Sequence, residues 1–179
     1  MTAQGDEDGP AEGRAPRVSV LDRSQCLEHL ARTSAGRVAY PAPDGTVAVV
    51  PVAYVLDGED VVFRTSSGSG VDRAAREGVL TFQADEADVR RRTGWSVMVV
   101  GQVEVHRTGG GGRPPVGEDA ATLLRPWAPG VKDVWVRVRA ERLSGRRVGP
   151  VGSTTQRPHG PHATWHVASR SWVVPYDGR

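Results

Sequence analysis

The residues best placed for chemistry are Arg64, Thr65, Ser66 and Ser69, which connect a predicted strand to a predicted helix. A guanidinium, three hydroxyls and the backbone N–H groups of a Gly/Ser turn can all donate hydrogen bonds to one anion, typically a phosphate. A simpler role is also open, in which Ser69 only caps the helix and Asp72 repels any phosphate that comes too close. The spacing therefore indicates either a phosphate-binding turn or a plain helix cap.

A second candidate is the Trp95-Ser96 pair, which follows Gly94 at the start of a long β-branched run. An indole and a hydroxyl at that point could line a pocket for a planar ligand. A tryptophan that simply packs in the core is more typical of such a strand.

Other residue types with catalytic or metal-binding potential form no recognisable site. His159, His162 and His166 have a spacing that superficially resembles a metal site, but they lie in a Pro/Gly-rich segment, so we predict a polar tail and no metal. Cys26 is the only cysteine, which excludes an internal disulfide and a cysteine zinc site. Nucleophile-elbow, Walker and dinucleotide-binding glycine motifs are missing from the sequence. No catalytic residue is identified.

The charge pattern argues against nucleic acid as a partner. The 179 residues carry 23 basic and 21 acidic side chains, for a net charge of +2. Acidic residues are interleaved with the arginines, so there is no basic stripe. The sequence shows neither a signal-peptide pattern nor an apolar run long enough to span a bilayer. We expect a soluble cytoplasmic protein that binds neither nucleic acid nor membrane.

The elements that position the candidate residues are mostly short strands. Strands are predicted at 36–40, 47–56, 61–64, 79–84, 95–106 and 134–138, and short helices near 22–31, 71–77 and 118–124. Pro51 inside the second strand implies an edge, a bulge or a ligand-facing position, and Gly101 marks a bend or a close approach. Hairpins in series with few helices predict a mainly β fold, a small six-stranded antiparallel barrel.

The two ends of the chain differ in composition from residues 17–148, which we predict to form one domain. Residues 1–16 are mainly Gly, Asp, Glu, Pro and Ala and are expected to be disordered. Residues 149–179 form a Pro/Gly/His-rich tail. Trp165 and Trp172 are too apolar for a fully solvated tail, so we expect part of it to dock on the domain.

The order and spacing of several motifs resemble the pyridoxamine 5′-phosphate oxidase-like superfamily, and within it the actinobacterial flavin-binding split-barrel proteins related to the nitroimidazole-resistance type. The motifs are Val50-Pro51-Val52-Ala53-Tyr54-Val55-Leu56-Asp57-Gly58, Val62-Phe63-Arg64-Thr65, Gly68-Ser69, Gly94-Trp95-Ser96-Val97, Val100-Gly101, Pro126-Trp127-Ala128-Pro129-Gly130 and Ser144-Gly145-Arg146-Arg147. The resemblance implies a split β-barrel, a homodimer and FMN sites at the dimer interface. The implied activity is an FMN-dependent oxidoreductase acting on an unidentified small molecule.

The resemblance also assigns expected roles to residues. The flavin phosphate is expected at Arg64, Thr65, Ser66 and Ser69, and the isoalloxazine along Pro51, Val52 and Ala53. Trp95 and Ser96 match the strand that closes the site, which in such proteins can come from the other subunit.

Two departures from the family pattern leave alternatives open. Gly70 stands where family members carry Lys or Arg as a charge partner for the phosphate, and Arg64, Arg73 or one of residues 90–92 could compensate. Arg142-Leu143 is followed by Ser144-Gly145 rather than by the family's substrate-binding ending, which argues against vitamin B6 oxidation. A deazaflavin or haem cofactor, or a non-catalytic cofactor-binding protein, remains an alternative.

Overall fold

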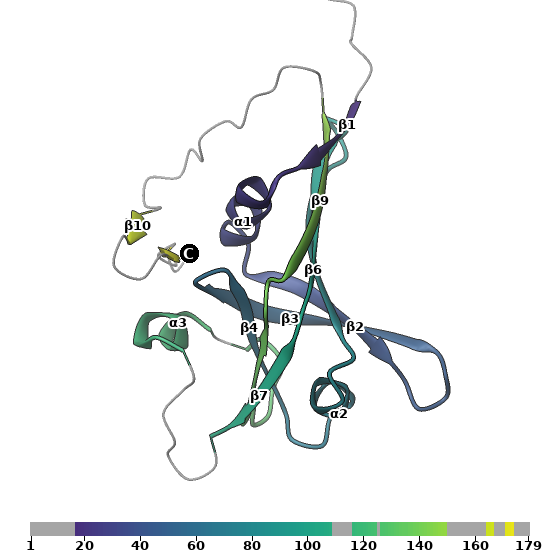
Figure 1. Cartoon of the computed structure of the whole chain (residues 1–179), viewed down its shortest axis with the longest axis vertical. Coiled ribbons are helices and arrows are strands. Elements are labelled where there is room, and N and C mark those ends of the chain that lie inside the picture. The colour runs from purple at the N-terminus through teal and green to yellow at the C-terminus, as the bar shows by residue number, and fades with distance from the viewer. Residues whose placement is uncertain (1–16, 109–115, 125, 150–163, 167–170, 174–179) are drawn as a thin grey trace, which may run out of the picture.

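The computed structural model describes residues 17–108, 116–124, 126–149, 164–166 and 171–173 (Figure 1). The helices are α1 (Arg23–Ala31), α2 (Gly70–Arg76) and α3 (Glu118–Leu123). The strands are β1 (Arg17–Leu21), β2 (Ala35–Pro41), β3 (Val47–Asp57), β4 (Asp60–Thr65), β5 (Thr81–Asp88), β6 (Thr93–Val100), β7 (Val103–Arg107), β8 (Val134–Val138), β9 (Arg142–Gly149), β10 (Thr164–His166) and β11 (Ser171–Val173).

Nine of these strands form one antiparallel sheet in the order β1-β9-β6-β5-β2-β3-β4-β8-β7. The predicted mainly β fold with short helices is confirmed, but the predicted number of six strands is too low. One reason is that the expected strand 95–106 bends into β6 and β7, and another is that β1 and β9 were missed. β9 carries Arg, Ser and Gly at most positions, so the apolar alternation that marks a strand is weak there, and β1 has only five residues and pairs with β9 alone.

The bend between β6 and β7 depends on Gly101. A Cβ atom at this position would lie 2.0 Å from the carbonyl oxygen of Arg139, so only glycine allows the two backbones to approach so closely. Gln102 accepts a hydrogen bond from the Arg139 N–H at 2.9 Å. The predicted close approach at Gly101 is therefore confirmed, and it occurs where β8 also bends into β9.

The core lies on the inner face of this curled sheet. Val38, Phe82 and Val99 are neighbours across three strands and are fully buried, and Tyr54 packs edge-on against Phe82. Figure 1 shows α1 beside the β9 end of the bent strands and α2 beside the β7 end. The two helices thus cover opposite ends of the core.

Helix α1 begins as its sequence predicts. The Asp22 carboxylate accepts the N–H of Gln25 at 2.9 Å, and the Gln25 side chain accepts the N–H of Asp22 at 3.0 Å. This reciprocal capping box satisfies two N–H groups at the helix start. Cys26 is fully buried close to Gly145 of β9, which leaves no room for a larger residue at Gly145.

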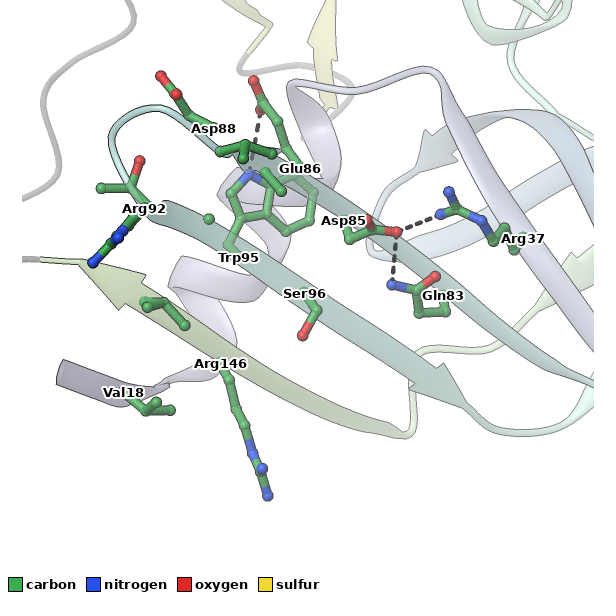
Figure 2. Close-up of a pocket in the computed structure, with 15 residues that line it drawn as sticks. Val18, Arg37, Gln83, Asp85, Glu86, Asp88, Arg92, Trp95, Ser96 and Arg146 are labelled. Carbon is green, nitrogen blue, oxygen red and sulfur yellow. Dashed lines mark hydrogen bonds and ion pairs between the residues drawn. The ribbon is translucent and has the colours of Figure 1, made fainter. Parts of the chain in front are cut away.

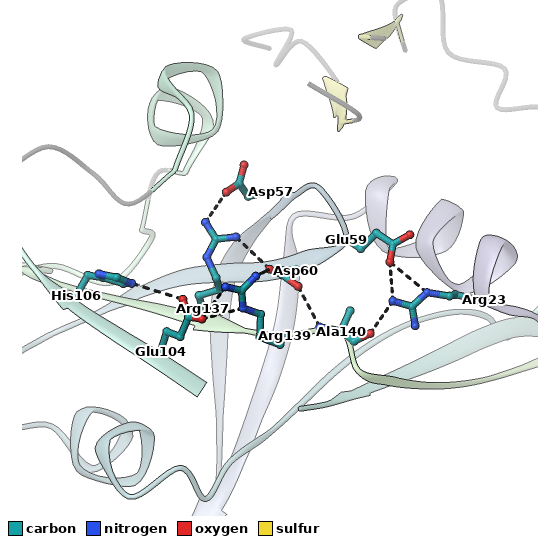
Figure 3. Close-up of polar contacts among 9 residues, drawn as sticks. All are labelled: Arg23, Asp57, Glu59, Asp60, Glu104, His106, Arg137, Arg139 and Ala140. Carbon is teal, nitrogen blue, oxygen red and sulfur yellow. Dashed lines mark hydrogen bonds and ion pairs between the residues drawn. The ribbon is translucent and has the colours of Figure 1, made fainter. Parts of the chain in front are cut away.

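A polar network joins the β3–β4 hairpin to β7 and β8 (Figure 3). Asp60 accepts hydrogen bonds from Arg137 at 3.2 Å, from Arg139 at 3.0 Å and from the Ala140 N–H at 3.1 Å. Arg139 also pairs with Glu104 of β7. The network fastens the hairpin end to the bent strands.

The tail forms a short hairpin, because β10 and β11 pair with Trp165 opposite Trp172. Its docking on the domain stays a prediction. Residues 1–16, which we expect to be disordered, lie outside the described residues. Most of residues 149–179 lie outside them as well. None of the helices in the described part of the chain is long and apolar enough to cross a membrane.

Candidate functional site

The first set of predicted site residues gathers where β3 changes its partner strand. β3 pairs with β2 from Val47 to Ala53 and with β4 only from Tyr54 to Asp57. Pro51, Val52 and Ala53 therefore lie on a stretch with a ladder on one side, beside the point where β4 ends at Thr65. Pro51 is tolerated because one side of the strand there has no β4 partner, as its position predicted.

Strand alternation divides these three residues between two faces. Pro51 is exposed on the outer face of the sheet, and Ala53 lies on the same face against the cluster around Trp135. Val52 packs against the main core on the inner face. A ligand on the outer face could therefore contact the side chains of Pro51 and Ala53, but only the backbone of Val52.

The polar turn, residues 65–70, connects β4 to α2. Thr65 is buried and its hydroxyl is hydrogen-bonded to that of Ser69 at 2.9 Å. The Ser69 hydroxyl also accepts the Asp72 N–H at 3.1 Å, so Ser69 caps α2. The helix-cap role is thus present, and the hydroxyls of Thr65 and Ser69 are occupied with each other.

The next two hydroxyls of the turn contact a distant segment, residues 126–133. Ser66 donates to the Val131 carbonyl at 2.8 Å and accepts from Lys132 Nζ at 3.1 Å. Ser67 donates through its N–H and its hydroxyl to the Asp133 carboxylate, at 2.9 and 2.5 Å. These bonds from Ser67, with the charge of Arg107 as a smaller cause, hold the pKa of Asp133 below its ordinary value.

Arg64 is fixed by the same segment. Its Nε donates to the Lys132 carbonyl at 2.8 Å, a second nitrogen donates to the same oxygen, and the guanidinium lies 4.9 Å from the centre of the Trp135 ring. This cation–π contact keeps the charge beside the turn.

A buried carboxylate lies beneath the turn. Asp72 is fully buried, and its oxygens accept from the Gly68 N–H at 2.8 Å and from Arg107 at 3.0 and 3.1 Å. Arg76 pairs with the same carboxylate at 3.2 Å. The two guanidinium partners offset the desolvation cost of burying this carboxylate.

The turn therefore carries more positive than negative charge. Within the described residues, four cations and two carboxylates are bonded to the turn, to α2 or to residues 131–133: Arg64, Arg76, Arg107 and Lys132, with Asp72 and Asp133. An excess of two positive charges, next to exposed serine hydroxyls, suits a phosphate dianion.

Gly70 is explained by its neighbour Tyr40. A Cβ atom on Gly70 would lie 2.5 Å from the Tyr40 hydroxyl oxygen and 2.9 Å from a ring carbon. Tyr40, on β2, fills the space that a basic side chain at position 70 would need to leave the helix. A lysine or arginine cannot be accommodated there unless Tyr40 moves.

The second set of predicted residues, Trp95 and Ser96, lies elsewhere on the sheet. Ser96 is opposite Asp85 on β5, and β5 and β2 separate β6 from β3. Three strand spacings amount to roughly 14 Å. One chain therefore does not bring Trp95 and Ser96 together with Pro51 and the polar turn.

Trp95 and Ser96 also point to opposite sides of β6 (Figure 2). Ser96 is exposed in a shallow groove of about 820 Å³ on the outer face, with Arg37, Asp85 and Arg146. Trp95 points toward α1, where its ring stacks on His29 at 4.6 Å and its N–H donates to Glu86 at 3.3 Å. The packing role of Trp95 is therefore visible in the structure.

Sequence reasoning missed Arg107, Lys132 and Asp133, which complete the charged surroundings of the turn. Arg107 ends β7, and the other two precede β8. The one signal in the sequence was that Lys132 is its single lysine. No local pattern indicates that the segments carrying these three residues meet residues 65–70. Residues 90–92, considered as substitute cations, lie at the far end of β5, roughly 23 Å along the strand from its start near α2.

Comparisons with known proteins agree with this architecture. Residues 22–147 match the family described as pyridoxamine 5′-phosphate oxidase. The uncharacterised protein Rv0080 of Mycobacterium tuberculosis is 32% identical over 140 residues, covering 75% of this chain and 88% of that protein. The solved FAD binding protein of Mycobacterium smegmatis is 28% identical with a TM-score of 0.56, covering 72% of this chain and 97% of that one. A conserved protein of unknown function from Corynebacterium diphtheriae is 30% identical with a TM-score of 0.51, covering 72% and 96%.

Proposed function

Because this chain belongs to the pyridoxamine 5′-phosphate oxidase-like split-barrel family, we propose that it is a flavin-binding oxidoreductase that holds FMN beside the split between β3 and β4. The observation that supports this most is the excess of positive charge around the polar turn, next to the open side of β3. FMN needs both features, since it carries a phosphate at one end and a flat ring system at the other.

The residues present fit the two ends of such a cofactor. Pro51 and Ala53 offer a flat, side-chain-poor surface on the outer face for the isoalloxazine. The hydroxyls of Ser66 and Ser67 donate to the Val131 carbonyl and to Asp133, and a bound phosphate would replace these acceptors. Bound there, the flavin would supply the hydride chemistry, while the protein binds and orients it. The substrate is proposed to be a small molecule other than a vitamin B6 phosphate.

We further propose that a second copy of the chain completes the site. The outer face of β1, β9, β6, β5, β2 and β3 exposes the apolar residues Val18, Val20, Val47, Val49, Met98 and Val148. Arg37, Asp85 and Arg146 lie among them and give the face charges of both signs, which suits pairing with an identical face. Within one chain, Ser96 lies roughly 14 Å from Pro51. A partner on this face would bring its own Ser96 closer to Pro51.

The identity of the flavin is tested by titration. The purified full chain is expected to be yellow, or to become yellow with FMN, with absorption near roughly 450 nm. At a hundredfold excess over Kd, FMN should add about 2.7 kcal/mol of stability, seen as a rise in Tm of several degrees. FAD is tested in parallel, because the Mycobacterium smegmatis relative is described as FAD binding. A colourless protein whose Tm rises with neither flavin would contradict the proposal.

A further inference from the structure

The position of the missing cation suggests where the phosphate charge is balanced instead. We propose that Arg107 of β7, together with Lys132, supplies the positive charge for the flavin phosphate that Gly70 cannot supply. This inference rests on the proposed flavin site and adds to it two binding residues, neither of which belongs to α2.

Arg107 reaches the turn from a strand that is distant in sequence. One terminal nitrogen donates to the Ser67 hydroxyl at 2.7 Å, and the other contacts both oxygens of Asp72. A guanidinium has five N–H donors, so these three bonds leave further donors available. The side chain is 45% exposed, so the free part of the guanidinium can be reached by a ligand.

Lys132 lies on the neighbouring hydroxyl. Its Nζ is 3.1 Å from the Ser66 hydroxyl and 3.2 Å from the Pro129 carbonyl oxygen. Two cations of different segments therefore flank two consecutive serine hydroxyls. A phosphate that replaced the Val131 carbonyl as acceptor at Ser66, and Asp133 as acceptor at Ser67, would contact both charges.

Two carboxylates limit the affinity of this place for anions. Asp72 is buried and neutralised by Arg76 and Arg107. Asp133 is less buried and holds the N–H and hydroxyl of Ser67, which a phosphate would also use. The negative charge of Asp133 therefore opposes a phosphate at Ser67, and its removal should strengthen phosphate binding.

The positive charges at the turn come from other segments of the chain than α2. A basic side chain at position 70 would be carried by α2, but Tyr40 occupies the space that this side chain would need. Arg107 and Lys132 depend instead on β7 and on residues 126–133, which meet the turn only in the folded domain. The chain thereby keeps selectivity for phosphorylated flavins although the helix has lost its basic residue.

The test compares FMN with riboflavin, which has the same ring system and ribityl chain but no phosphate. Arg107→Gln is expected to weaken FMN binding by about tenfold or more, the usual effect of losing one charge-assisted contact, and to leave riboflavin affinity within about twofold. Lys132→Gln should act in the same direction. Arg107→Lys, which keeps the charge, should recover part of the FMN affinity.

Arg23→Gln is the matched control. Arg23 pairs with Glu59 and with the Ala140 carbonyl at the opposite end of β4 from the turn. Its loss should leave the ratio of FMN to riboflavin affinity unchanged. Asp133→Asn should raise FMN affinity and leave riboflavin affinity unaltered. Circular dichroism and urea unfolding establish that each variant is folded.

The possible outcomes separate the two proposals. If the unmodified protein binds FMN but Arg107→Gln leaves the ratio of FMN to riboflavin affinity unchanged, the role of Arg107 is wrong and the flavin site stands. An equal loss of FMN and riboflavin affinity in Arg107→Gln would also contradict a phosphate contact. If the unmodified protein binds neither flavin, both proposals fail.

Discussion

Tyr40 and Gly70 show that a missing side chain can have a steric cause. The tyrosine hydroxyl occupies the space next to the Gly70 Cα, so the glycine follows from the packing of β2 against α2. The positive charge expected at position 70 is present nearby, on Arg107 and Lys132. Gly70, which in the sequence suggests the loss of a phosphate-binding residue, is thus required by its packing against Tyr40.

His29 is the second residue whose surroundings have a measurable consequence. It is 9% exposed, stacks on Trp95, and its Nδ1 has no hydrogen-bond partner among the described residues. Burial, and to a smaller extent the charges of Arg32 and Arg147, lower its pKa from 6.5 to about 4. The folded protein therefore holds His29 neutral over a pH range in which the unfolded chain protonates it.

This difference predicts a pH-dependent stability. Between pH 6.5 and 4 the unfolded chain binds the proton first, so the free energy of unfolding should fall as the pH drops, by about 3 kcal/mol in total from this group. His29→Phe keeps an aromatic ring on Trp95 but cannot titrate, so its loss of stability over this range should be smaller. Urea unfolding of both proteins from pH 7 to 4 measures the difference. Parallel curves would show that His29 is not responsible.

At the scale of elements, the change of partner along β3 creates the candidate site. β3 belongs to the β2 ladder up to Ala53 and to the β4 ladder from Tyr54. The same strand therefore has an open side next to the polar turn, where β4 ends. The site depends on this divergence of two strands more than on any one motif.

The network at Asp60 is expected to hold the β3–β4 hairpin in place. Asp60 is 15% exposed and accepts hydrogen bonds from two arginines and one backbone N–H. Asp60→Ala should therefore lower the free energy of unfolding by about 2–4 kcal/mol, because the half-buried Arg137 loses this carboxylate partner. Glu59→Ala is the control next to it. The Glu59–Arg23 pair is exposed, and its loss should cost less than about 1 kcal/mol. Equal urea midpoints for the two variants would contradict the structural role of Asp60.

At the scale of the whole molecule, one face of the sheet is unusually apolar for a solvent-exposed surface. The β2–β3 hairpin extends beyond the neighbouring strands and carries Val47 and Val49, which are 70% and 57% exposed (Figure 1). The face continues across β6 to Val20 of β1, which is 81% exposed. Exposed apolar residues with charged residues among them on one face are typical of a protein interface.

The proposed dimer predicts that a charge on this face separates the subunits. The unmodified chain should elute as a dimer in size-exclusion chromatography with light scattering, and Val49→Asp should elute as a monomer with unchanged circular dichroism. Val79→Asp is the control, since Val79 is 49% exposed but lies in the turn after α2. A monomeric unmodified protein at micromolar concentration would contradict the proposed pairing.

Local features were predictable from the sequence because neighbouring residues create them. The start of the first helix near Asp22, the open strand side at Pro51 and the close approach at Gly101 all appear as expected. β9 was missed because its Arg, Ser and Gly residues show little apolar alternation, and β1 was missed because it is short and pairs only with β9.

By itself the sequence determined the fold class, the family and the strand-turn-helix segment at residues 64–70. Tertiary structure alone decided which charges surround that segment, because Arg107, Lys132 and Asp133 reach it through strand pairings that join residues about 40 to 66 positions apart. It also placed Ser96 three strands away from Pro51 and turned Trp95 toward His29. The physical reason is that periodicity and caps act within a few residues, whereas the electrostatics of a site is the sum over every segment that folding brings to it.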